Sequence, residues 1–205
     1  GLHASLLPKY KGGAPLVWAM INGEKKTGIT LFQMDNGVDS GPIVGQKKEP
    51  IRPDDTIATL YDRIEERGLE LIQKFLPRLV HNSLRLKVQD ETKSFIMPQR
   101  SPEDGLIDWK MDAMFIDRFV RAQTKPYPGA FTILDSKPLH VWRTSVASGI
   151  DKMKSGYVKK NDDGTYRVTC SKGTLIIREI SYENREYLQS QLGELFGEGG
   201  QILGH

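Results

Sequence analysis

The sequence predicts an α/β fold in its N-terminal part, followed by a small all-β domain. The run at 28–34 carries apolar residues on both faces, as an interior strand of a covered sheet does. A long apolar stripe at helical spacing follows over 57–79, and after residue 130 short β-like runs alternate with turns. We therefore place the domain boundary between 1–132 and 133–205.

The first elements are predicted to be a loop and a short helix. Residues 1–15 are rich in glycine and proline, which disfavours a long regular element there. Pro15 suits the first turn of a helix, because the backbone N–H that it lacks would have no partner in that turn. The apolar run 16–21 then ends at Asn22-Gly23, a helix stop signal.

A strand, a turn region, a second strand and a helix follow. Turn signals at 35–37 and 39–42 separate the strand at 28–34 from a short strand at 43–48. Asp54-Asp55-Thr56 is a typical helix start. The apolar residues after it recur at helical spacing and predict one long amphipathic helix packed on the sheet: Ile57, Leu60, Ile64, Leu71, Phe75 and Leu79.

The remainder of the chain changes from helical to β-like patterning. Asp112 precedes a second helix with Ile116, Phe119 and Val120 on its buried side, and the KPYPG segment at 125–129 breaks it. Short runs with turns between them then favour a small barrel or sandwich. These runs lie at 131–134, 139–142, 156–158, 166–170 and 174–180.

Composition excludes several classes of protein. A formal net charge of +3 excludes a polybasic nucleic-acid arm and charge-driven disorder. The lone Cys170 excludes an intramolecular disulfide and a cysteine-based zinc site, and it favours a reducing, cytoplasmic compartment. No apolar run approaches the roughly 18–20 residues that span a bilayer, so we expect no membrane partner.

His3 and Asp39 are the residues best placed to carry chemistry. His3 lies in the Gly/Pro-rich first loop, and Asp39 follows the interior strand between Gly37 and Gly41. Ligands of open α/β sheets bind beyond the carboxyl ends of strands, where an aspartate can orient a histidine or move protons. A structural loop histidine and a turn aspartate that satisfies local N–H groups stay open as alternatives.

Two long segments add a family resemblance. One reads HASLLPKYKG over 3–12 and the other GITLFQMDNGVDSG over 28–41, which separates His3 and Asp39 by 39 − 3 = 36 residues. Both resemble signatures of the folate-dependent formyltransferases, in the family's order and at its spacing. The likeness continues through 53–56, 108–109 and 121–130 and covers essentially the whole chain.

The resemblance implies a Rossmann-like catalytic domain followed by a small OB-like β-barrel, in agreement with the boundary drawn from the pattern. The family's first strands and helices would lie ahead of Gly1. We therefore expect a fragment that lacks the N-terminal half of its catalytic domain and that is inactive alone.

The resemblance also implies a reaction: transfer of a formyl group from N10-formyltetrahydrofolate to a primary amine, without a metal. His3 matches the family's histidine, which would hold the oxyanion or move the proton. Asp39 matches its aspartate, which would orient His3 and accept the amine's proton. The pterin and formyl group are expected against two segments: Ser5, Leu6, Leu7 and Pro8, and Met34, Asp35, Asn36, Gly37 and Val38. Plain core packing of Leu6 and Leu7 stays open.

The sequence departs from the family at two positions. Gly1 stands where the family has an asparagine, so one donor to the oxyanion is missing, a loss that can cost about 100–1,000-fold in rate. Either a backbone N–H or a water replaces that donor, or the glycine is not the native residue. Lys11 replaces the usual arginine, which keeps the charge and loses the bidentate geometry.

Three functions are considered: transfer to either of two acceptors, and binding without catalysis. Residues 138–205 hold nine Lys/Arg and eight Asp/Glu, a net of 9 − 8 = +1, which is weak support for a large RNA partner. The segments 14–24 and 100–104 resemble the amino-sugar enzymes, so we expect the amine of a nucleotide-linked amino sugar. The alternatives are methionyl-tRNA and a non-catalytic module that binds folate or a partner.

Overall fold

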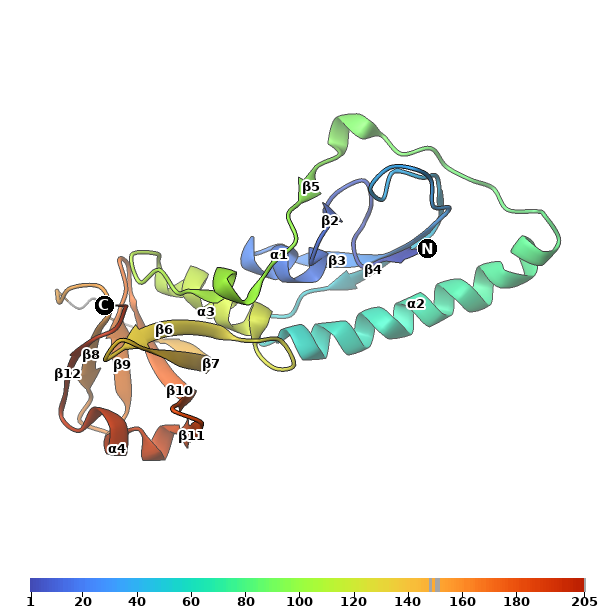
Figure 1. Cartoon of the computed structure of the whole chain (residues 1–205). Coiled ribbons are helices and arrows are strands. Elements are labelled where there is room, and N and C mark those ends of the chain that lie inside the picture. Colours follow the sequence, from blue (N-terminus) through green and yellow to red (C-terminus); the bar gives the residue numbers. More distant parts are fainter. Residues whose placement is uncertain (148, 150–151, 205) are drawn as a thin grey trace. The chain divides into compact units, whose positions relative to one another are not determined.

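The structure is a computed structural model that describes residues 1–147, 149 and 152–204. It divides into two compact units, 1–100 and 101–205, whose elements are labelled in Figure 1. No helix among the described residues is both long and apolar enough to cross a membrane.

The division between the units falls earlier than the boundary expected at 132/133. Helix α3 (Ala113–Gln123) and the segment before it contribute Ile107, Trp109 and Ile116 to the same buried cluster as Leu139 of the second unit. Sequence patterning grouped this helix with the helical region before it. The apolar faces of these residues pack instead on the β-rich unit.

The sheet of the first unit contains β1 (Leu2–His3), β3 (Lys26–Phe32) and β4 (Ile43–Pro50), in the antiparallel order β1-β3-β4. The two strands expected from the sequence are confirmed as β3 and β4. β3 ends at Phe32, so Met34 lies outside it in the following loop. A separate parallel pair joins β2 (Lys11–Gly12) to β5 (Ile96–Met97).

Two helices cover this sheet. The expected short helix is α1 (Pro15–Ile21), which buries Leu16 and Val17, and the expected long helix is α2 (Ile57–Val80). Thr56 caps α2: its hydroxyl accepts from the N–H of Thr59, and the Thr59 hydroxyl accepts from the Thr56 N–H. The predicted stripe is buried only as far as Leu71, and beyond it Leu79 is exposed.

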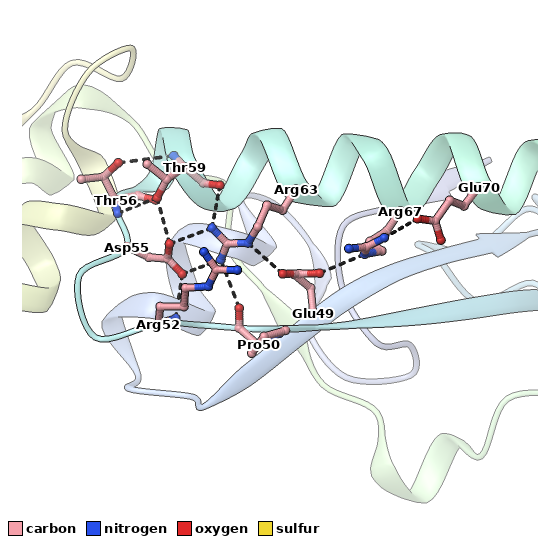
Figure 2. Close-up of polar contacts among 9 residues, drawn as sticks. All are labelled: Glu49, Pro50, Arg52, Asp55, Thr56, Thr59, Arg63, Arg67 and Glu70. Carbon is pink, nitrogen blue, oxygen red and sulfur yellow. Dashed lines mark hydrogen bonds and ion pairs between the residues drawn. The ribbon is translucent and has the colours of Figure 1, made fainter.

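Buried ion pairs tie α2 to β4 (Figure 2). The Arg63 guanidinium donates to Glu49 Oε1 at 2.7 Å and to Asp55 Oδ2 at 2.6 Å, and both carboxylates are buried. Arg67 donates to the second oxygen of Glu49 at 3.0 Å and also pairs with Glu70. The sequence assigned Asp55 only to the helix start, because nothing local marks a contact with Arg63.

The second unit is an antiparallel, barrel-like sheet. Its described strands follow the order β12-β8-β9-β10-β7-β6, and β11 pairs with β10. The five expected runs correspond to β6 to β10, whereas the sequence analysis missed β11 and β12. The strands and the short helix are β6 (Ala130–Leu134), β7 (Lys137–Ala147), β8 (Tyr157–Lys160), β9 (Tyr166–Thr169), β10 (Thr174–Tyr182), β11 (Arg185–Leu188), β12 (Gly199–Ile202) and α4 (Gly193–Phe196).

A buried side-chain hydrogen bond joins the segment before α3 to this sheet, in addition to the backbone bond from the Ile107 N–H to the Phe131 carbonyl. Trp109 Nε1 donates to Thr132 Oγ1 at 2.9 Å, and both residues are buried. We predict that Trp109→Phe lowers the free energy of unfolding by about 1–3 kcal/mol, since it leaves the threonine hydroxyl unpaired. Urea denaturation measures the loss. Trp18→Phe is the matched control because its Nε1 bond to Pro98 is exposed, and equal losses for the two variants would contradict the prediction.

Candidate active site

The structure brings together the two predicted catalytic residues. His3 is buried in β1, where it pairs with Thr30 of β3. Its Nδ1 lies 3.3 Å from Asp39 Oδ2, and its Nε2 lies 2.7 Å from the carbonyl oxygen of Tyr10. Both ring nitrogens therefore have a neighbour, and the ring orientation is fixed from two sides.

Asp39 is the more exposed residue of this pair. Its side chain is 21% exposed, against 9% for His3, so the carboxylate is more accessible to solvent than the imidazole. The backbone N–H of Gly12 donates to Asp39 Oδ2 at 2.8 Å. Asp39 has a φ of 49°, in the left-handed region that few non-glycine residues adopt. Backbone strain of this kind is common at functional sites, and it persists where contacts with surrounding residues hold the backbone in place.

The two neighbours of the His3 ring are both hydrogen-bond acceptors. A neutral imidazole carries one N–H and can donate to only one of them, whereas an imidazolium donates to both. The ring therefore has a hydrogen-bond acceptor next to each of its two nitrogens.

The loop after His3 is fixed by β3 and β4. The hydroxyl of Thr30 donates to the carbonyl of Ser5 at 2.6 Å and accepts from the N–H of Leu7 at 3.2 Å. Gln46 donates to the same hydroxyl and to the carbonyl of Leu7, each at 2.9 Å. Sequence reasoning missed Thr30 and Gln46, because neither lies near the loop in the sequence.

The four predicted folate-binding residues of this loop differ in accessibility. Ser5 is buried and its hydroxyl donates to the carbonyl of Lys9 at 2.7 Å. Leu7 packs in a small buried cluster with Phe32 and Ile43, which supports core packing for this residue. Leu6 and Pro8 are half-buried and keep accessible surface.

The other five predicted folate-binding residues lie together in an exposed loop. Met34 is 72% exposed and Val38 is 54% exposed, which leaves apolar side chains facing solvent. Asp35 accepts from the Ser40 hydroxyl at 2.6 Å and from the Gly37 N–H at 3.0 Å, and these bonds hold its pKa below the usual value. A Cβ at Gly41 would lie 1.7 Å from the carbonyl oxygen of Gln33, so the loop requires glycine there.

The two departures from the family also have structural consequences. A Cβ at Gly1 would lie 3.1 Å from the flexible Met34 side chain, so a larger residue there needs only a small shift. Lys11 is buried, and its Nζ donates to both carboxylate oxygens of Glu91, at 2.9 and 3.0 Å. Lys11 therefore anchors the segment around Glu91.

An apolar cavity adjoins the start of the chain. Its volume is about 480 Å³, and it extends from Gly1 and Met34 along the exposed half of α2. Its lining is almost entirely apolar: Gly1, Leu31, Phe32, Gln33, Met34, Val44, Ile72, Phe75, Leu76, Leu79, Leu84 and Leu86.

Comparison with known proteins shows the family to which the chain belongs. The sequence profile described as Formyl transferase matches residues 1–76, and that described as Formyl transferase, C-terminal domain, matches residues 100–192. The chain belongs to the formyl transferase family. The first profile covers His3, Asp39 and the loops around them, and the second covers the barrel-like unit.

Individual members of the formyl transferase family align along most of the chain. Methionyl-tRNA formyltransferases of several bacteria are 36–41% identical; that of Geobacter metallireducens is 41% identical over 206 residues, covering 100% of this chain and 65% of the relative. The chain thus spans less than two thirds of the length of these curated relatives.

Two solved structures share the fold. HypX from Aquifex aeolicus in complex with tetrahydrofolic acid superposes with a TM-score of 0.72, at 19% identity over 95% of this chain and 35% of that one. The N-formyltransferase from Helicobacter canadensis, with folinic acid and dTDP-3-aminofucose, gives 0.70 at 22% identity, over 91% of this chain and 65% of that one.

Proposed function

We propose that this chain carries the catalytic pair of an enzyme that transfers a formyl group from N10-formyltetrahydrofolate to a primary amine. The observation that carries the proposal is the 3.3 Å contact between His3 Nδ1 and Asp39 Oδ2, inside the segment that matches the formyl transferase profile. The donor supplies an activated formyl group on a nitrogen that can leave as an amine.

The residues present fit such a donor. The loop 34–38 offers exposed apolar side chains at Met34 and Val38, and Leu6 and Pro8 keep surface on the neighbouring loop. A flat heterocycle needs apolar contacts, and these two loops supply them. We assign donor binding to them.

His3 and Asp39 then divide the proton chemistry. The acceptor amine forms a bond to the formyl carbon, the carbonyl oxygen becomes an oxyanion, and the bond from carbon to N10 breaks. Asp39, whose side chain is the more exposed of the two, accepts the proton that the attacking amine loses. His3 donates to the oxyanion in place of its contact with the Tyr10 carbonyl. The proton ends on the leaving nitrogen, so the products are a formamide and tetrahydrofolate. Gly1 has no side chain that could donate to the oxyanion, so in this assignment the oxyanion is stabilised by His3.

We further propose methionyl-tRNA as the acceptor. The sequence analysis favoured an amino sugar because the barrel carries little net charge. Relatives that are 36–41% identical are methionyl-tRNA formyltransferases, whereas the likeness to an amino-sugar enzyme stands at 22% identity and supports the fold alone. The comparisons therefore favour the alternative over the amino-sugar reading.

A direct competition of acceptors tests this proposal. The full-length native protein is supplied with N10-formyltetrahydrofolate and either methionyl-tRNA or a panel of nucleotide-linked amino sugars. We expect kcat/KM at least about 100-fold higher for methionyl-tRNA, and a KM for tRNA that rises steeply with salt, because phosphate contacts release counterions. Transfer to a sugar alone would support the amino-sugar reading, and folate binding without any transfer would support the non-catalytic module.

A further inference from the structure

One buried glutamine connects a distant segment to the turn that holds Asp39. Gln89 is 6% exposed, and its Nε2 donates to the carbonyl oxygens of Asp39 and Gly41, each at 2.7 Å. Its Oε1 is buried without a hydrogen-bond partner among the described residues. The side chain is therefore committed to the turn through its amide nitrogen.

The turn needs such a support. The left-handed backbone at Asp39 (φ 49°) belongs to a conformation that costs a non-glycine residue energy and persists only where surrounding contacts fix it. One amide group carries two N–H donors, which matches two carbonyl oxygens on either side of Ser40. Gln89 thus holds the backbone on both sides of that residue.

The segment that carries Gln89 also fixes the other partner of the Asp39 carboxylate. Lys11 N donates to the carbonyl of Phe95 and Gly13 N to that of Met97, both at 3.1 Å, as β2 pairs with β5 (Figure 1). Between these two bonds, Gly12 N donates to Asp39 Oδ2. The stretch 89–97 therefore supports Asp39 from its backbone and from its carboxylate.

We propose that Gln89 is a positioning residue for the formyl-transfer reaction, which fixes the backbone of Asp39 so that its carboxylate faces His3. The inference rests on the proposed function of His3 and Asp39. Gln89 acts through Asp39, because its amide nitrogen donates to the carbonyl oxygens of Asp39 and Gly41. A displacement of about 1 Å in a reacting group can lower the rate about 100-fold. The hydrogen bonds of Gln89 to the Asp39 turn therefore affect the rate of formyl transfer.

Substitutions at Gln89 test the proposal in the full-length native protein. Gln89→Ala lowers kcat by about 10- to 100-fold and changes KM for donor and amine by less than about threefold, because binding surfaces stay in place. Gln89→Glu loses more at neutral pH, since a carboxylate cannot donate to either carbonyl.

Gln201→Ala is the matched control. Gln201 Nε2 donates to the carbonyl of Phe196 at 3.1 Å. Its Oε1 is also buried without a hydrogen-bond partner in the part of the chain that the structure describes, so both glutamines lose the same kind of bond. A loss of kcat at Gln89→Ala no larger than that at Gln201→Ala, after correction for folded protein, would overturn the proposal.

Hydrogen exchange provides a readout that is independent of turnover. The Gly12 N–H donates to the Asp39 carboxylate, so its protection falls at least tenfold in Gln89→Ala and stays unchanged in Gln201→Ala. Unchanged protection in Gln89→Ala would overturn the positioning role even if formyl transfer is confirmed. An active His3→Ala variant would instead refute the proposed function, while the exchange result still decides whether Gln89 positions Asp39.

Discussion

Replacing Asp39 by asparagine lowers the rate of formyl transfer by about 100- to 10,000-fold while the protein stays folded. Asparagine has nearly the same shape, and its Oδ1 can still accept the Gly12 N–H. The substitution removes the negative charge that lies 3.3 Å from His3 Nδ1 and the group that accepts the amine's proton. Steady-state kcat for formyl transfer measures the loss, and circular dichroism with urea denaturation confirms the fold.

A control variant shows whether the loss of activity is specific to the Asp39 carboxylate or follows from removing any carboxylate that accepts a backbone N–H in a turn. Asp163 also accepts a backbone N–H in a turn, from Thr165 at 2.9 Å, and lies in the barrel-like unit. Asp163→Asn keeps kcat within about twofold of the native protein. Activity of Asp39→Asn within tenfold of the native protein would contradict a catalytic role for Asp39.

Replacing Arg63 by methionine lowers the free energy of unfolding by about 3–5 kcal/mol at neutral pH. The substitution keeps most of the apolar stem and removes the guanidinium that serves two buried carboxylates, Glu49 and Asp55 (Figure 2). Without Arg63, the carboxylates of Glu49 and Asp55 stay buried but lose its guanidinium as a hydrogen-bond donor. The matched control is Arg185→Met, since Arg185 and Glu194 are each about half exposed, and an ion pair screened by solvent contributes little to stability.

The same network makes stability depend on acid. Burial raises the pKa of Glu49 and of Asp55, but hydrogen bonds, above all from Arg63, outweigh burial and hold each pKa below its ordinary value of 4.5 or 3.8. A depressed folded pKa stabilises the protein above the ordinary value, and this stability is lost as pH falls through the folded pKa. Urea midpoints of the native protein therefore fall once pH drops below about 4, and the deficit of Arg63→Met shrinks over the same range. An equal, pH-independent deficit for Arg63→Met and Arg185→Met would contradict the account.

Local patterns predicted the elements that carry local signals. The two-faced strand β3, the capped helix α2 and the proline-started helix α1 all follow from side-chain periodicity and end residues. The pairing of His3 with Asp39 followed from a resemblance, since 36 residues separate them and no periodic signal links them.

Contacts between distant segments were beyond the reach of the sequence. Gln89 lies 50 residues from Asp39, and Thr30 lies 25 residues from Ser5, so only the fold brings each pair together. The unit boundary was missed for the same reason. An amphipathic pattern shows that α3 buries one face, but it does not show which sheet covers that face.

A double-mutant cycle on His3 and Asp39 tests most directly whether the two residues act as one catalytic unit. Formyl transfer under single-turnover conditions is measured for the native full-length protein, His3→Ala, Asp39→Asn and the double variant. Residues that act as a unit give losses far from additive, so we predict that the double variant is about as slow as the slower single variant. A double variant slowed by the product of the two single losses, or either single variant within tenfold of the native rate, would contradict the account.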